Sequence, residues 1–261
     1  MTPPTAAQIT ASLTAQSLPA PTPLFLAPIL TSSSSSSSSS SLTSSSRPLA
    51  ALTATAKHRL LHTSISTNPS PLQPTSASLP ATISNAAIAA TALAVDTFVQ
   101  ILDIQDLGRS RWEQIEALEA ERKGETTKGR EVIRVVPAEP NGGEASQASA
   151  QAQLPNGNAN VNANAKGPFK LLLQDWKGTT VWAFELKKVE RIAMPPALGM
   201  GIGCKILLRR GTRVARGTVL LEPACVMVFG GRVEGLDSAW KAEREQRLRR
   251  EVEAQRGERD G

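Results

Sequence analysis

Two apolar runs of strand length, separated by a short polar break, dominate residues 169–187, which read FKLLLQDWKGTTVWAFELK. Residues 179–184 are β-branched or aromatic at nearly every position, and this composition favours a strand over a helix. The break ends at Gly178, which can adopt the positive φ that a four-residue hairpin loop needs. The sequence therefore predicts a β-hairpin here.

Further strand-like runs lie around the hairpin. They cover residues 130–136, 202–211, 212–221 and 224–229. The last two are separated by Glu222-Pro223, because proline cannot take a central position in a sheet ladder. A set of five or six short strands, with a non-strand connection at residues 190–201, suits a small closed barrel. We expect a mainly β fold with flanking helices, built on a five-stranded barrel of the OB type.

Weakly helical segments precede the predicted barrel, and together they form an expected helical region at residues 1–95. The segments are residues 6–16, 23–30 and 48–62, and residues 86–95 are a further helix candidate made of small side chains. A serine-rich insert at residues 31–46 interrupts the region. It cannot bury enough apolar surface to offset chain entropy, so we expect it to be disordered.

Two more helices are expected within and after the barrel region, which spans residues 96–236. Ser110 and Glu113 form a capping box, and the helix that it opens places Trp112, Ile115 and Leu118 on one packing face. Residues 237–261 form a charged C-terminal helix and tail, which we expect to dock through Trp240 at its start.

The composition excludes several classes of protein. The net charge of +6 is divided equally between residues 1–95 and the remainder, so it gives little support for nucleic-acid binding. No apolar run reaches membrane-spanning length. The first 46 residues contain no Arg or Lys, which argues against a transit peptide. Cys204 and Cys225 lie in apolar runs, as small hydrophobic side chains would, and this fits a cytosolic or nuclear setting.

The sequence contains no recognisable catalytic or cofactor-binding constellation. The glycine-rich residues 199–203 are not followed by the Lys-Ser/Thr pair that a phosphate loop needs. His58 and His62 are four residues apart, but two ligands do not complete a metal site. The cysteines have no neighbouring histidine to activate them. We therefore expect neither an enzyme nor a metal or cofactor site.

A binding function remains, and single-stranded DNA is one ligand that an OB barrel takes by stacking bases on exposed aromatics. Residues that could contact DNA or a partner are Trp176, Lys177, Lys205, Arg209 and Arg210. Period-2 alternation assigns Trp182, Phe184 and Leu186 to the core side and the intervening residues to the outside. Under that assignment Trp176, in the hairpin loop, is the evident stacking residue.

Five stretches resemble the N-terminal region of the RecQ-mediated genome instability protein 1 family, in its order and spacing. They are VQILDIQDLG at 99–108, KLLLQD at 170–175, GCKILL at 203–208, and GTVLLEP at 217–223 followed by VFGGRV at 228–233. The resemblance covers residues 97–240. It implies a short, fungal-type member with one OB domain. It further implies a nuclear, non-catalytic adaptor of a RecQ-family helicase and topoisomerase III, which together dissolve double Holliday junctions.

The resemblance also implies that a long loop between the first and second barrel strands reaches the DNA gate of the topoisomerase. Residues 138–166 occupy the matching place, with Glu139, Pro140, Leu154 and Val161 as candidate partner contacts. The alternative is an autonomous OB-fold protein that binds single-stranded or junction DNA, for which oligonucleotide binding would depend on Trp176 and Lys177.

Overall fold

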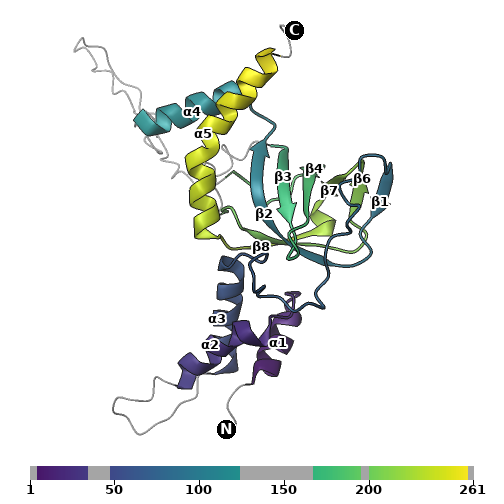
Figure 1. Ribbon diagram of the computed structural model, residues 1–261, viewed down its shortest axis with the longest axis vertical. Coiled ribbons are helices and arrows are strands. Elements are labelled where there is room, and N and C mark those ends of the chain that lie inside the picture. The colour runs from purple at the N-terminus through teal and green to yellow at the C-terminus, as the bar shows by residue number, and fades with distance from the viewer. Residues whose placement is uncertain (1–4, 35–47, 124–166, 195–199, 258–261) are drawn as a thin grey trace, which may run out of the picture.

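The computed structural model describes residues 5–34, 48–123, 167–194 and 200–257 (Figure 1). Its centre is one curled sheet with the strand order β1-β6-β7-β4-β3-β2-β5-β8. The strands are β1 (Ala90–Ala92), β2 (Thr97–Asp106), β3 (Phe169–Gln174), β4 (Thr180–Glu185), β5 (Lys205–Leu208), β6 (Arg213–Ala215), β7 (Thr218–Leu221) and β8 (Val226–Gly230). Eight strands are therefore described, and the expected number of five is not confirmed.

A turn and a 3₁₀ helix that interrupt the strand-like runs account for part of the difference in strand number. The run that we expected to form one strand over residues 212–221 is divided by a tight turn, where Arg216 and Gly217 both have positive φ. A 3₁₀ helix, η3 (Pro223–Cys225), separates β7 from β8. β7 pairs in parallel with β4, whereas β8 pairs with β5 at the far end of the sheet order. The short link through η3 therefore curls the sheet around its core.

The predicted hairpin is present as β3 and β4, and Gly178 has a φ of +89°. The two faces of β4 are opposite to our expectation. Val181, Ala183 and Glu185 point into the core, while Trp182 and Phe184 are half-buried on the outside. On β3 the inward residues are large, and Leu171 pairs directly with Ala183. A narrow barrel interior accommodates a large residue opposite a small one, so the bulky aromatics of β4 lie outside.

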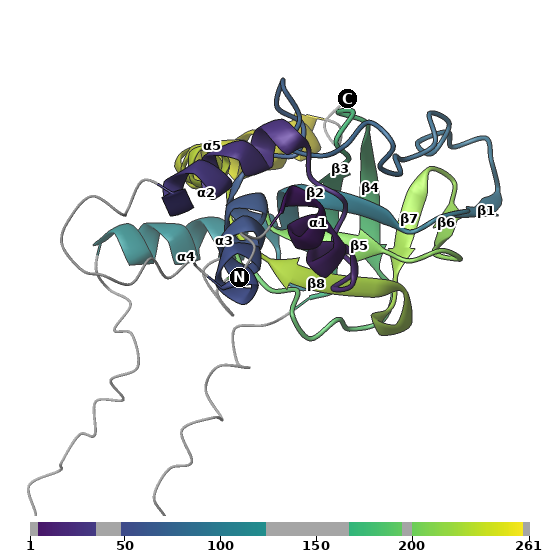
Figure 2. The same ribbon diagram turned by 90° about the horizontal axis from the view of Figure 1, so that it is seen from below.

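Three N-terminal helices cover the outer surface of β2, β5 and β8 (Figure 2). They are α1 (Ala6–Thr14), α2 (Pro23–Ser34) and α3 (Leu49–His62), close to the expected helical segments. Phe98 of β2 and Leu207 of β5 belong to the apolar cluster that these helices form. Gln100 adds a polar connection, because its Oε1 accepts from the Ile65 amide at 3.1 Å. The helical part and the sheet are thus packed together.

Residues 90–92 are not helical, which corrects our expectation for residues 86–95. They form β1, which pairs antiparallel with β6. Leu79 and Ile83 are also buried in the core of the sheet. The sheet therefore includes chain that we had assigned to the helical region.

Two further helices, α4 (Arg111–Lys123) and α5 (Glu234–Gly257), pack against each other beside β2. The capping box opens α4, with the Glu113 amide donating to Ser110 Oγ at 3.1 Å. Ile115 is buried on the packing face, but the side chain of Trp112 is 52% exposed, which corrects its expected place there. Trp240 docks α5 as expected. Among the described helices, none has the length and apolar character needed to cross a membrane.

Candidate partner interface

The predicted partner contacts Glu139, Pro140, Leu154 and Val161 lie outside the described residues, as do the expected strand at 130–136 and most of the serine-rich insert. The structure does describe the chain on both sides of residues 124–166. α4 ends at Lys123, and β3 begins at Phe169. The surroundings of α4 and of the start of β3 therefore define the two ends between which residues 124–166 run.

The chain that leaves β2 and the chain that enters β3 meet at a closed base. The Leu107 amide donates to the Pro168 carbonyl at 3.0 Å. The backbones then approach so closely that a Cβ on Gly108 would lie 2.5 Å from the Gly167 carbonyl oxygen. A side chain at residue 108 would force these backbones apart. Residues 109–166, which include α4, therefore form one excursion that starts and ends at a single place on the sheet.

Glu185 holds the β3 side of this base. Its side chain is buried, and its two oxygens accept from different backbone amides: Oε2 from Phe169 at 3.1 Å and Oε1 from Val189 at 2.8 Å. Lys188 Nζ lies 3.8 Å from Oε1 and supplies a counter-charge. A buried carboxylate needs such partners to be tolerated. The entry to β3 is therefore fixed to the end of β4 by a charged residue.

Ion pairs between the two long helices hold the α4 side. Arg111 Nε lies 2.6 Å from Glu251 Oε2, at the start of α4. Farther along the pair, Arg249 binds Glu119 and also Glu245 of its own helix. Single exposed pairs contribute little, but several in one network orient two helices with respect to each other. α4 thus has a defined direction at Lys123, where it ends.

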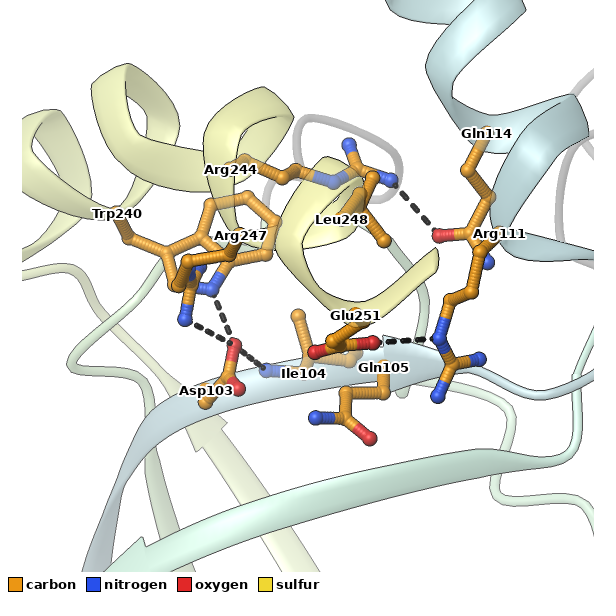
Figure 3. A pocket seen from close by; sticks show the side chains of 10 residues that line it. All are labelled: Asp103, Ile104, Gln105, Arg111, Gln114, Trp240, Arg244, Arg247, Leu248 and Glu251. Atoms are coloured by element: carbon orange, nitrogen blue, oxygen red, sulfur yellow. Dashed lines mark hydrogen bonds and ion pairs between the residues drawn. The ribbon is translucent and has the colours of Figure 1, made fainter. Parts of the chain in front are cut away.

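A polar joint attaches α5 to β2 (Figure 3). Asp103 accepts from the indole N–H of Trp240 and lies 3.3 Å from Arg247 Nη1. The guanidinium groups of Arg244 and Arg247 lie 5.1 and 5.7 Å from the Trp240 ring centroid. Burial lowers the pKa of Arg244, although nearby carboxylates favour its charged form. The cavity at this joint is only about 30 Å³, so the joint is a packed support and has no room for a ligand.

Trp176 and Lys177 lie in the β3–β4 turn, but the tryptophan is not a free stacking platform. Its Nε1 donates to the Ser76 carbonyl at 3.1 Å, and its half-buried ring packs against the helical cluster. Asp175, which the sequence analysis did not single out, organises this turn. Its carboxylate accepts from the amides of Thr179 at 2.8 Å and Leu79 at 2.8 Å. Lys177 is exposed, with Nζ 5.3 Å from the Trp176 ring centroid.

Lys205 was a candidate contact with DNA or a partner, but the structure buries it beneath the N-terminal helices. Its side chain is 0% exposed, and Nζ donates to the carbonyls of Gly203 at 2.5 Å and Leu61 at 3.4 Å. Leu61 lies in the last turn of α3, where exposed carbonyls favour a cation. Burial lowers the pKa of Lys205 to about 8, and the nearby Cys204 acts weakly in the opposite direction. Lys205 joins the helices to the sheet.

Arg209 and Arg210 are exposed in the turn after β5, as their assignment as contact residues requires. The Arg210 amide donates to Asp96 Oδ1 at 2.7 Å, which fixes the backbone and leaves the guanidinium outside. His58 and His62 are both exposed, with ring centroids 4.2 Å apart. Nowhere in residues 5–34, 48–123, 167–194 and 200–257 do three His, Cys, Asp or Glu side chains gather as a metal site would need.

Comparison with known proteins confirms the resemblance found in the sequence. The family described as RMI1, N-terminal OB-fold domain, matches residues 79–244. A protein of Schizosaccharomyces pombe named RecQ-mediated genome instability protein 1 is 27% identical over 139 residues. That match spans 53% of this chain and 57% of the relative, so little more than half of each is comparable. Because the family match covers most of the chain, including the whole curled sheet, the chain belongs to the RMI1 family and contains its N-terminal OB-fold domain.

Proposed function

We propose that the chain is a non-catalytic adaptor in a nuclear complex of topoisomerase III with a RecQ-family helicase. In this complex it promotes strand passage and the dissolution of double Holliday junctions. The observation that carries the proposal is membership of the RMI1 family over residues 79–244. The name of the S. pombe relative, which refers to RecQ-mediated genome instability, gives further support.

The proposed adaptor docks on the topoisomerase through its OB-fold sheet and through residues 138–166, including Leu154 and Val161. The closed base at Gly108 and Gly167 supports this arrangement, because it fixes where the excursion leaves and rejoins the sheet. The α4–α5 ion pairs support it from the other flank. An adaptor of this kind acts by binding one conformation of the enzyme more tightly than another.

The role of residues 138–166 is tested by replacing them with a short Gly-Ser linker. The fold should be nearly unchanged, because shortening a loop alters stability by about 1 kcal/mol or less. Binding to the cognate topoisomerase III should survive in part, since the sheet remains, whereas stimulation of decatenation should fall sharply. A matched control shortens the serine run at residues 32–41 and should stimulate normally. A linker variant that stimulates strand passage as well as the intact chain would remove the gate role of this segment.

A further inference from the structure

A groove lies on the helical part of the chain, between the start of α2 and the turn that follows α3. We call it the helical groove; it has a volume of about 320 Å³, and its apolar lining consists of Leu24, Phe25, Pro28, Pro69 and Pro71. A cavity of this size is at the lower end of the range for ligand sites. In Figure 1 the groove-bearing helices α2 and α3 lie at the opposite end of the molecule from α4.

Hydrogen bonds to the backbone fix the shape of the helical groove. The Thr22 amide donates to the Pro71 carbonyl at 2.8 Å, which ties the start of α2 to the turn after α3. Within that turn, Ser70 Oγ donates to the Ile65 carbonyl at 3.1 Å. The walls are therefore held together by the fold itself, so a ligand would meet a preorganised surface.

α2 presents apolar side chains to the groove as well as to the core. Leu26 and Ile29 are buried in the cluster of the N-terminal helices. Leu24, by contrast, is 66% exposed, and Pro28 is exposed as well. Phe25 lies between the two sides and is half-buried. Adjoining apolar side chains that a fold leaves exposed commonly mark a docking site.

Arg59 of α3 is the charged residue in the lining of the groove. The hydroxyl groups around it are used within the fold: Thr63 Oγ1 donates to the Arg59 carbonyl at 2.8 Å, and those of Thr22, Thr67 and Ser70 also bond to the backbone. Among the described residues, the Arg59 guanidinium has neither an ion pair nor a hydrogen bond. It is therefore available to a ligand.

The charge around the groove favours an acidic ligand. Residues 1–95 contain no Asp or Glu, so the helical part has no carboxylate of its own to offer Arg59. A guanidinium binds a carboxylate through two parallel hydrogen bonds, which gives both strength and direction. A ligand that fits both the charge and the lining carries a carboxylate beside a large apolar group.

We propose that the helical groove binds a short acidic segment of a partner protein, with a large apolar side chain against Leu24 and Phe25 and a carboxylate on Arg59. A second copy of the chain is less favoured, because a symmetric contact would bring two basic surfaces together. Nucleic acid is also less favoured, since it needs several cations along its backbone and this lining supplies one. The proposal goes beyond the adaptor function and does not depend on it.

The test selects short peptides from a random phage-displayed library on the immobilised full chain. Selected peptides should share a large apolar residue flanked by Asp or Glu. Fluorescence anisotropy of one labelled selected peptide then gives its Kd for the intact chain and for variants. The affinity should fall as salt rises, because an exposed ion pair contributes to it.

Two variants change the groove itself. Arg59→Glu should raise Kd about tenfold or more, since attraction to the peptide becomes repulsion. Leu24→Asp should have a similar effect, because it removes an apolar contact and adds a like charge. A peptide whose carboxylates are replaced by lysine should recover binding to Arg59→Glu. This exchange of charges would identify the contact, which a merely structural effect of the variant could not do.

Two matched variants serve as controls. Arg250→Glu reverses an exposed charge on α5, and Val95→Asp introduces a carboxylate at an exposed apolar position before β2. Both should change Kd by no more than about twofold, as expected for surface positions away from the ligand. Thermal melting of each variant establishes that the fold is intact.

Co-purification with topoisomerase III separates this proposal from the adaptor function, because Leu24→Asp should still bind the enzyme. The proposal is overturned if no peptide is selected, if the selected peptides lack acidic residues, or if folded Arg59→Glu and Leu24→Asp bind them as well as the intact chain. It is also overturned if Leu24→Asp leaves peptide binding unchanged but abolishes topoisomerase binding or a dimer of the chain. The groove would then hold the enzyme or a second copy.

Discussion

The indole N–H of Trp240 donates a hydrogen bond to the carboxylate of Asp103, which joins the C-terminal helix to β2. Asp103 lies where the pairing register between β2 and β3 shifts, just after Ile101. An irregularity of this kind inserts one residue and redirects the side chains that follow. Ile101 and Ile104 can therefore both be buried in the core while Asp103 points toward α5. The irregularity makes β2 both a core strand and the support of α5.

Replacing Asp103 with Ala should lower the free energy of unfolding by about 2–3 kcal/mol. The change leaves the Trp240 N–H and the Arg247 guanidinium without their shared acceptor in a largely buried joint. Urea denaturation followed by circular dichroism measures the effect. Glu243→Ala, on the exposed side of α5, is the control and should stay within about 0.5 kcal/mol of the intact chain. An equally small effect at Asp103 would contradict the joint as described.

Glu185→Gln should also destabilise the fold, by about 1–3 kcal/mol, although it preserves the size of the side chain. The carboxylate uses both oxygens to accept from backbone amides, whereas an amide group has only one acceptor and would turn its NH₂ toward the other donor. Urea denaturation with an unchanged m-value checks the prediction. Glu190→Gln, at an exposed position close by, should have little effect. If the two variants are equally stable, Glu185 does not hold the entry to β3.

The buried Lys205 predicts a rise of stability with pH. Burial lowers the pKa of its ammonium from 10.5 to about 8, whereas the unfolded chain retains the ordinary value. Between these two values the unfolded chain binds a proton that the folded chain does not, so the free energy of unfolding rises with pH. Well below pH 8 both states are protonated, and the contribution no longer changes.

Comparison with Lys205→Met between pH 7 and pH 9 isolates this contribution. The intact chain should gain up to about 1 kcal/mol relative to the variant over the upper unit of that range. The range stops at pH 9 because burial raises the pKa of Cys204 to about 11, which lowers stability at higher pH. Urea denaturation at each pH provides the two curves. If the free energy of unfolding depends on pH in the same way for the intact chain and the variant, Lys205 has the same pKa in the folded and unfolded states.

The sequence predicted where the hairpin lies but not which face of β4 points inward. Both faces of this strand are apolar, with Val181 and Ala183 on one side and Trp182 and Phe184 on the other. Hydrophobicity therefore cannot distinguish them, and the larger residues were assigned to the core. Glu185 was assigned to the outside because period-2 alternation places it on the same face as Val181 and Ala183. The structure buries it, since two backbone amides and Lys188 compensate the carboxylate.

The burial of Lys205 could not be predicted for a different reason. All four residues of β5 are buried, because the curled sheet covers one side of the strand and the N-terminal helices cover the other. Period-2 alternation places a lysine on an outer face, which is correct here, but it does not reveal that a helix end covers that face. The three helices themselves were found from their patterns, whereas their position on the sheet depends on contacts distant in sequence.

The most direct test of the adaptor function is binding between the purified full-length chain and its cognate topoisomerase III. Isothermal titration calorimetry, together with size-exclusion chromatography of the mixture, measures this without a requirement for DNA. We predict a stable complex at micromolar concentrations, and Asp103→Ala should weaken it, because loss of the α5 joint loosens the support of α4. The absence of any complex at micromolar concentrations of two folded proteins would contradict the adaptor function.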